Sequence, residues 1–226
     1  MWGFRRSSWV AVSFSLCLSL SSGSAGAKAP SDAELAAGAF VEALRDGNLV
    51  AQTWQVPGLV APIVRVRVQA PDLQPAELFA VAWDVGSQAR WAPRLKRLDI
   101  LSSGPDELLL YEQIDAPVVR DRDYVVRLRA TARGDGPGGS FRIDASGASD
   151  PSRPVDPSHI RMTDLWSRFS FVPRAGGGCE LTYDAFGDPA GALPGWLKRS
   201  AGVRGPVDFV QALVTEARRR RDKKPL

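Results

Sequence analysis

Few of the residue types that commonly do chemistry lie close together in this sequence. It has one histidine, His159, and two cysteines, Cys17 and Cys179, far apart along the chain. A metal site needs three or four nitrogen, oxygen or sulfur ligands, and a cysteine or serine nucleophile needs a base beside it. There is no Gly-x-Ser-x-Gly elbow and no glycine-rich phosphate loop between a strand and a helix. The sequence therefore predicts no metal site, no cofactor and no catalytic residue.

The most informative polar pair is Arg122 and Asp123, which open a predicted strand over 122–133. Side chains alternate between the two faces of a strand, so Arg122 shares its face with an apolar run of Tyr124, Val126 and Leu128. On that face its guanidinium could hold a phosphate or a carboxylate by paired hydrogen bonds. The alternative is an ion pair between Arg122 and Asp123 that holds the rim of a sheet. The residues alone leave both alternatives open.

The positive charge of the chain is local. The 226 residues carry a formal net charge of +4, but six of the basic residues crowd into the last nine positions, 218–226. The body over 28–217 has a slight excess of acidic residues, so it offers no basic surface for nucleic acid. The basic tail is typical of a solvated helix end, or it is attracted to anionic lipid head groups. We expect no nucleic-acid partner.

The first 27 residues have the pattern of a secretory signal peptide. Arg5 and Arg6 precede an apolar stretch over 9–20, and the small residues Ala25-Gly26-Ala27 suit a signal peptidase. The alternative is a single uncleaved membrane anchor. Cleavage predicts a secreted or periplasmic protein in which Cys179 is the one remaining cysteine, so no intramolecular disulfide forms. The mature chain must then be stabilised by its hydrophobic core.

The length suits one domain, and its hydrophobic pattern is mostly that of strands. Helices are predicted from Ser31 to about Arg45, from Pro75 to about Asp84, in a short piece over 87–91, and from Leu193 through Ala217. Strands are predicted around 49–55, 62–69, 94–102, 107–115, 122–133, 140–148, 159–172 and 180–187. This order predicts an α+β fold with one antiparallel sheet.

One amphipathic helix is too narrow to cover a long curved sheet. The terminal helix repeats its apolar side chains at helical spacing, and Gly205-Pro206 marks a place where it bends. We therefore expect a hollow between helix and sheet, lined by apolar side chains, and such sites bind small apolar molecules.

Several motifs follow one another along the chain. They are Pro75-Ala76-Glu77-Leu78-Phe79-Ala80-Val81-Ala82-Trp83-Asp84, Trp91-Ala92-Pro93-Arg94-Leu95-Lys96, Tyr111-Glu112, Arg120-Asp121-Arg122-Asp123-Tyr124-Val125, Tyr183, and Asp188-Pro189-Ala190-Gly191-Ala192-Leu193-Pro194-Gly195-Trp196-Leu197. Taken in order, these motifs resemble the START (StAR-related lipid transfer) domain of the helix-grip superfamily. The similarity covers nearly all of 48–217. It implies a helix-grip fold, in which a curved antiparallel sheet wraps around a long C-terminal helix and encloses an internal hydrophobic cavity.

The resemblance also implies a function. It predicts a carrier of a lipid or sterol-like molecule over 28–217, with the terminal helix as a lid, no catalysis and no fixed cofactor. Apart from the resemblance, we expect a monomer that makes transient contact with a membrane surface. Candidate cavity and lid residues are Arg122, Tyr124, Val126, Leu128, Tyr183, Trp196, Phe209, Val210 and Leu213. Trp196 either packs in the core or touches a membrane interface. Because helix-grip relatives include polyketide cyclases and aromatases, an enzyme of that kind is the alternative.

Overall fold

A computed structural model describes residues 28–116, 119–133, 138–191 and 195–223. The predicted leader over 1–27 lies outside these ranges, and so does the side chain of Trp196. The helices are α1 (Asp32–Ala37), α2 (Pro75–Trp83), the 3-10 helix η1 (Val85–Arg90) and α3 (Gly195–Asp222). The strands are β1 (Val41–Asp46), β2 (Leu49–Trp54), β3 (Ile63–Ala70), β4 (Leu95–Ser103), β5 (Glu107–Ile114), β6 (Arg122–Arg133), β7 (Ser140–Ala148), β8 (Ile160–Arg161), β9 (Leu165–Pro173) and β10 (Cys179–Gly187).

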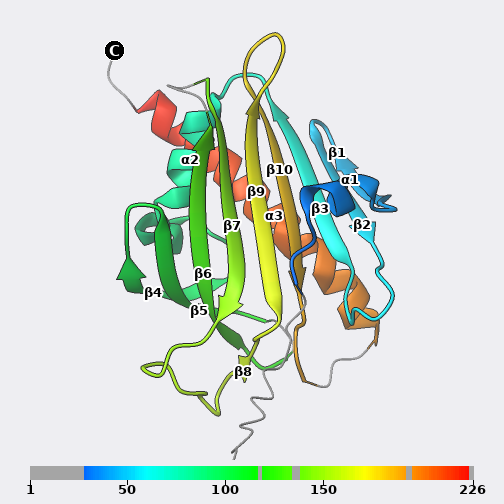
Figure 1. Ribbon diagram of the computed structural model, residues 1–226, viewed down its shortest axis with the longest axis vertical. Helices are drawn as coiled ribbons and strands as arrows, with labels where there is room; N and C mark the ends of the chain where they lie inside the picture. The colour runs from blue at the N-terminus through cyan, green and yellow to red at the C-terminus, as the bar shows by residue number, and fades with distance from the viewer. Residues whose placement is uncertain (1–27, 117–118, 134–137, 192–194, 224–226) are drawn as a thin grey trace, which may run out of the picture.

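All the strands of the described residues form one curved sheet (Figure 1). Its order is β1-β2-β3-β10-β9-β7-β6-β5-β4, with the short β8 beside β6. Neighbouring strands are antiparallel, except that β8 runs parallel to β6. The α+β fold expected from the sequence is confirmed: a curved antiparallel sheet with a long C-terminal helix.

The two faces of the sheet differ in what covers them. Helices α2 and α3 lie on one face, which we call the inner face, and α1 lies on the other, the outer face (Figure 1). Helix α3 packs against β2, β3 and β10, and α2 packs against β7, β9 and β10. Neither β5 nor β6 is among the strands closely packed by these helices within the described ranges. The helices therefore cover the inner face unevenly.

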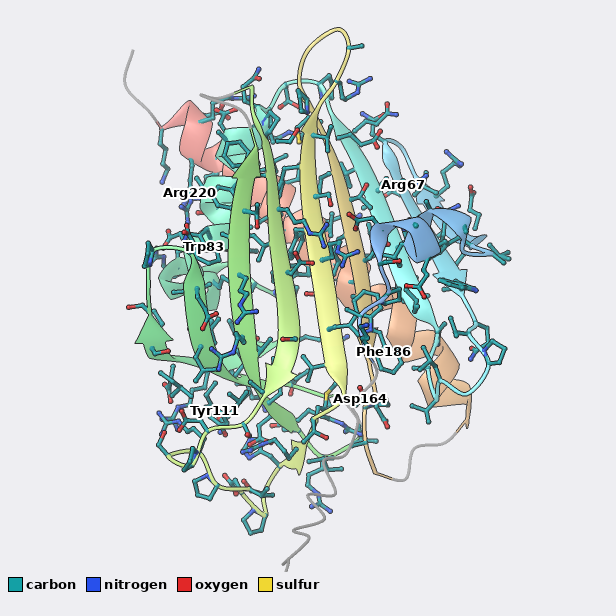
Figure 2. The ribbon with its side chains drawn as sticks, viewed as in Figure 1. Arg67, Trp83, Tyr111, Asp164, Phe186 and Arg220 are labelled. Atoms are coloured by element: carbon teal, nitrogen blue, oxygen red, sulfur yellow. The ribbon has the colours of Figure 1, made fainter. Side chains whose placement is uncertain are left out.

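Alternation along the strands separates these faces. In β3, Val64, Val66 and Val68 are buried in the main core, whereas Arg67 is exposed on the outer face (Figure 2). Arg65, also on the outer face, is buried because its guanidinium lies 4.1 Å from the centroid of Phe40 and pairs with Asp184. The apolar side of each strand thus forms the core between sheet and helices.

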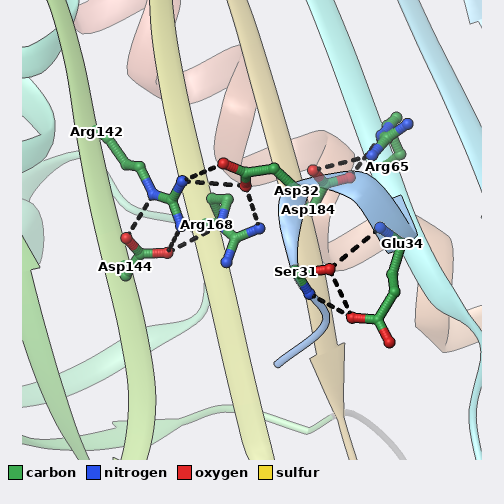
Figure 3. Close-up of polar contacts among 8 residues, drawn as sticks. All are labelled: Ser31, Asp32, Glu34, Arg65, Arg142, Asp144, Arg168 and Asp184. Carbon is green, nitrogen blue, oxygen red and sulfur yellow. Dashed lines mark hydrogen bonds and ion pairs between the residues drawn. The ribbon is translucent and has the colours of Figure 1, made fainter. Parts of the chain in front are cut away.

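Helix α1 is held on the outer face by charged side chains (Figure 3). Asp32 accepts hydrogen bonds from Arg142 at 2.8 Å and Arg168 at 2.7 Å, and Asp144 accepts from both arginines. Leu35 of α1 is buried in a small outer cluster with Ala61, Ile63, Trp166 and Phe186. The chain just after the predicted leader is therefore packed on the sheet, opposite α3.

The helix predicted from Ser31 to Arg45 is wrong beyond Ala37. The expected capping box does form, because Ser31 Oγ accepts from the Glu34 amide and Glu34 accepts from the Ser31 amide. The helix then ends at Gly38, whose backbone is extended. A Cβ at this glycine would lie 2.6 Å from the ring of Trp54, so the close approach of chain to sheet requires glycine.

The residues expected to stop that helix instead turn a β-hairpin. Asp46 pairs with Leu49 across β1 and β2, and Gly47 in the turn has a φ of 52°. A turn signal of this kind suits the end of a helix or a tight hairpin equally well. Here the chain forms the hairpin, which adds β1 to the edge of the sheet.

The remaining elements form close to their predicted limits, with two differences. The strand predicted over 159–172 is divided into β8 and β9, and the terminal helix continues beyond Ala217 to Asp222, with Pro206 inside it. No helix within the described ranges is both long enough and apolar enough to span a bilayer.

Candidate functional site

Five side chains from five elements meet on the inner face without being fully covered. They are Trp91 at the end of η1, Glu112 on β5, Tyr124 on β6, Tyr183 on β10 and Phe209 on α3, and all are half-buried. We call this group the inner patch. Phe209 joins Trp91 to Tyr183, with ring centroids 5.5 and 6.2 Å apart. The charge of Glu112 acts on both tyrosines.

The polar part of the inner patch is a hydrogen bond between neighbouring strands. Tyr124 and Glu112 are partners in the β5–β6 register, and Tyr124 Oη donates to Glu112 Oε2 at 2.6 Å. Burial raises the pKa of Glu112, partly opposed by this hydrogen bond. Burial also raises the pKa of Tyr124 well above its usual range and that of Tyr183 to about 12. Both tyrosines therefore hold their protons more tightly than a tyrosine in water, and burial shifts Glu112 toward its protonated form.

The other part is aromatic. Tyr183 stacks on Phe169 with centroids 4.1 Å apart, and Phe169 also lies 6.1 Å from Phe209. Large rings that keep an uncovered surface inside a domain offer apolar contact area beside a few oriented polar groups. The arrangement places an apolar aromatic surface beside one carboxyl and two hydroxyl groups.

Arg122 lies next to the inner patch but is itself buried, with 3% of its surface exposed. Its Nε donates to the carbonyl oxygen of Pro189 at 3.2 Å, and its Nη1 donates to the carbonyl oxygen of Arg120. Its Nη2 is buried without a hydrogen-bond partner. The guanidinium therefore lies between the chain just before β6 and the chain that leaves β10 toward α3.

The alternative of an ion pair between Arg122 and Asp123 is wrong. Asp123 is fully buried on the outer side of β6, where Arg161 donates to it at 2.9 and 2.8 Å and Tyr111 Oη donates at 3.0 Å. Arg161 follows a proline-rich loop far along the chain, so the sequence offered no local signal for this pairing. Asp123 ties β8 to the sheet and takes no part in the inner patch.

The similarity to known proteins agrees with this arrangement. The START domain family pattern matches residues 45–223. This chain belongs to the START domain family. An uncharacterized protein of Pseudomonas aeruginosa is 26% identical over 147 residues, which cover 64% of this chain and 70% of that protein.

Solved structures share the fold at low sequence identity. A STAR-related lipid transfer protein fragment from Xanthomonas axonopodis has a TM-score of 0.70 and 21% identity, covering 79% of this START domain chain and 98% of that one. Human StAR-related lipid transfer protein 5 has a TM-score of 0.69 and 14% identity, covering 80% and 86%. The Zhui aromatase/cyclase from Streptomyces sp. R1128 has a TM-score of 0.50 and 18% identity, covering 70% and 94%. At these identities the likenesses show a shared fold.

The structure places the sequence-predicted residues of this START domain in two groups. Tyr124, Tyr183 and Phe209 belong to the inner patch, with Arg122 beside it. The others that the structure describes are packed in the main core, at most 9% exposed: Val126, Leu128, Val210 and Leu213. The side chain of Trp196 lies outside the described residues.

Two members of the inner patch were missed as site residues. Glu112 was noted only as part of a family motif, although it alternates with Leu108 and Leu110 and so places a carboxyl on an apolar face. That alternation was the available signal. For Trp91 the sequence contained no comparable signal, because the position of its side chain depends on how η1 packs against β4 and α3.

The arginines near the C-terminus belong to α3, not to a free tail, as far as Asp222. Arg218 and Arg221 both pair with Asp72 in the β3–α2 loop, at 2.9 and 3.0 Å. Arg220, close to Trp83 in Figure 2, pairs with Asp84 at 2.9 Å. The ion pairs of Asp72 with Arg218, the larger cause, and with Arg221 lower the pKa of Asp72 to about 2. The C-terminal half of α3 is thus fastened to both ends of α2.

His159 does not form a catalytic triad with its neighbours. Ser158 Oγ lies 2.8 Å and Asp156 Oδ2 lies 3.2 Å from the same ring nitrogen, Nδ1, so the ring cannot relay a proton between them. Cys179 is fully buried, and burial raises the pKa of its thiol to about 12. Within the described part of the chain, no three His, Cys, Asp or Glu side chains gather as metal ligands would.

Proposed function

We propose that this START domain binds one amphiphilic lipid or sterol-like molecule against the inner patch, beneath α3. The observation that carries the proposal is that Trp91, Tyr124, Tyr183 and Phe209 are only half-buried although they lie between sheet and helix. Close packing between sheet and helix would cover more of these rings, because protein interiors leave few voids. Their uncovered surface is where an apolar chain lies, and each Å² of apolar area removed from water contributes about 25 cal/mol.

The polar end of the ligand lies near the Tyr124–Glu112 hydrogen bond. These groups sit in apolar surroundings, where a hydrogen bond to a ligand is stronger than it would be in water. They orient the ligand, while the aromatic rings supply most of the contact area.

The ligand enters when the N-terminal half of α3 moves. The C-terminal half has Val207, Val210 and Leu213 in the core and is fastened by its arginines to Asp72 and Asp84. At Gly205, by contrast, an added Cβ would meet nothing within 4 Å. A bend beside Pro206 therefore lets one half open while the other stays packed.

We further propose that the protein is an exported, monomeric carrier with transient membrane contact. The support is the sequence pattern of 1–27 and the presence of Trp196 in the N-terminal half of α3, because tryptophan is enriched at membrane interfaces. Mass spectrometry of the mature protein from an extracellular or periplasmic fraction should then give Lys28 as its first residue. An intact leader in the membrane fraction would contradict export.

The carrier proposal is tested by what the protein retains. Native mass spectrometry after gentle purification should show a bound lipid, and extraction should identify it. Recovery of the empty chain, together with no transfer between vesicles across a broad lipid panel, would refute the carrier. Turnover of a polyketide-like substrate that is lost in Arg122→Ala would instead favour an enzyme related to the cyclases.

A further inference from the structure

Arg122 is an exception among the buried arginines of the described residues. Arg65 pairs with Asp184 at 2.6 Å, and Arg168 pairs with Asp144 at 2.8 Å and with Asp32. Arg122 is as deeply buried as either, at 3% exposure, yet no carboxylate of the described chain forms an ion pair with it. A buried charge without a counter-charge is costly, so the site favours any ligand that supplies one.

The adjacent carboxylates are already engaged. Asp121, whose charge acts on Arg122, is bound by Lys96 at 2.7 Å, and Asp123 is bound by Arg161 on the outer side. The partners of Arg122 are backbone carbonyl oxygens, which hold the guanidinium in place without neutralising it. The unused Nη2 is one of two buried side-chain nitrogen or oxygen atoms in the described residues without a partner, the other being Arg153 Nε.

Arg122 also shares the face of β6 on which the inner patch lies. It precedes Tyr124 by two residues, and its register partner Ile114 stands two residues from Glu112 on β5. An anionic group near Arg122 would stabilise the protonated form of Glu112, whose pKa burial already raises. The polar end of the inner patch therefore offers donors to an oxygen anion.

The geometry points to an anionic head group on the ligand, a carboxylate or a phosphate, with Arg122 as its counter-charge through Nη2. This inference rests on the proposed function and names the ligand class within it. Charge-assisted hydrogen bonds are the strong ones, so the anion should contribute about tenfold or more in affinity.

Isothermal titration calorimetry with three ligands of one chain length tests it: dodecanoate, dodecyl phosphate and dodecanol. We expect at least one anion to bind about tenfold or more tightly than the alcohol, and the better anion tells carboxylate from phosphate. In Arg122→Gln this preference should disappear while dodecanol binding changes less than about twofold. Arg127→Gln, on the outer side of the same strand, should keep the preference.

The outcomes separate the two proposals. If dodecanol binds as tightly as both anions, or the preference survives in Arg122→Gln, the role of Arg122 is refuted while lipid binding stands. If none of the three binds, the anionic head group is refuted, and the broad lipid panel of the carrier test decides whether lipid binding stands. Should Arg122→Gln not fold by circular dichroism, the comparison of the three ligands on the unmodified protein still decides.

Discussion

Tyr124 on β6 donates a hydrogen bond of 2.6 Å to Glu112 on β5, inside the domain and without a cation in contact with that carboxyl among the described residues. This pair sets a titratable group on an otherwise apolar face. Burial raises the pKa of Glu112, so its charged form destabilises the folded protein as pH rises. An ion-paired surface carboxylate such as Asp72 acts in the opposite direction.

Replacing Glu112 by glutamine should remove a pH dependence of stability. A raised folded-state pKa means that the native state holds the proton more tightly than the unfolded state. Stability is therefore lost as pH rises from the ordinary glutamate pKa to the folded-state value, at about 1.4 kcal/mol per unit of difference. Urea unfolding between pH 4 and 8 should show Glu112→Gln gaining on the unmodified protein as pH rises. Parallel curves for the two proteins would contradict a raised pKa. Tyr124→Phe removes the hydrogen bond that lowers the pKa of Glu112, so the total loss of stability with rising pH should be larger in that variant.

Replacing Asp72 by asparagine should loosen the C-terminal half of α3. Because the folded-state pKa of Asp72 is lowered to about 2, its contribution is present at neutral pH and is lost as pH falls from about 4 toward 2. Partly exposed pairs are worth little, so we expect a loss of about 1 kcal/mol at pH 7 that vanishes in acid. Hydrogen exchange in 207–222 should rise in this variant and stay unchanged in Glu180→Gln, whose side chain is exposed on the outer face. Equal exchange in both variants would mean that the ion pairs do not hold the helix.

Stiffening the proposed bend should slow transfer. In Gly205→Ala the new methyl group meets nothing within 4 Å, and alanine stabilises a helix by up to about 1 kcal/mol relative to glycine. Transfer of a fluorescent lipid between vesicles should become several-fold slower, with little change in equilibrium affinity. Gly86→Ala, in η1 and equally free of contacts, serves as the control. Unchanged transfer in Gly205→Ala would place the moving element elsewhere.

The architecture was predictable from the sequence because a strand can be recognised from the alternation of apolar and polar residues within a short stretch of chain. Alternation in 62–69 and 122–133 placed β3 and β6, and the breakers between them placed the turns. The helix expected through Arg45 failed because its stop signal is also a hairpin signal. Only the close approach of Gly38 to Trp54, fixed by distant parts of the chain, decides between the two.

The site was harder to predict because its contacts join distant residues. Alternation correctly placed Arg122, Tyr124 and Leu128 on one face, but which of them packs into the core depends on how α2, η1 and α3 lie over the sheet. The choice of Arg161, not Arg122, as the partner of Asp123 depends on a loop that returns beside β6. Strand alternation carries no information about either.

The central claim is that the ligand lies against the inner patch, and a space-filling variant tests it most directly. Ala145 is half-buried on the inner face and pairs in register with Ser167, whose side chain acts on the pKa of Tyr183 in the inner patch. Ala145→Trp should therefore fill the ligand's place, whereas Ser146→Trp, one position along β7, adds the same ring to the outer face. Fluorescence titration with cis-parinaric acid and dehydroergosterol should show binding weakened at least about tenfold in Ala145→Trp and nearly unchanged in Ser146→Trp. Full-strength binding in a folded Ala145→Trp would contradict the account.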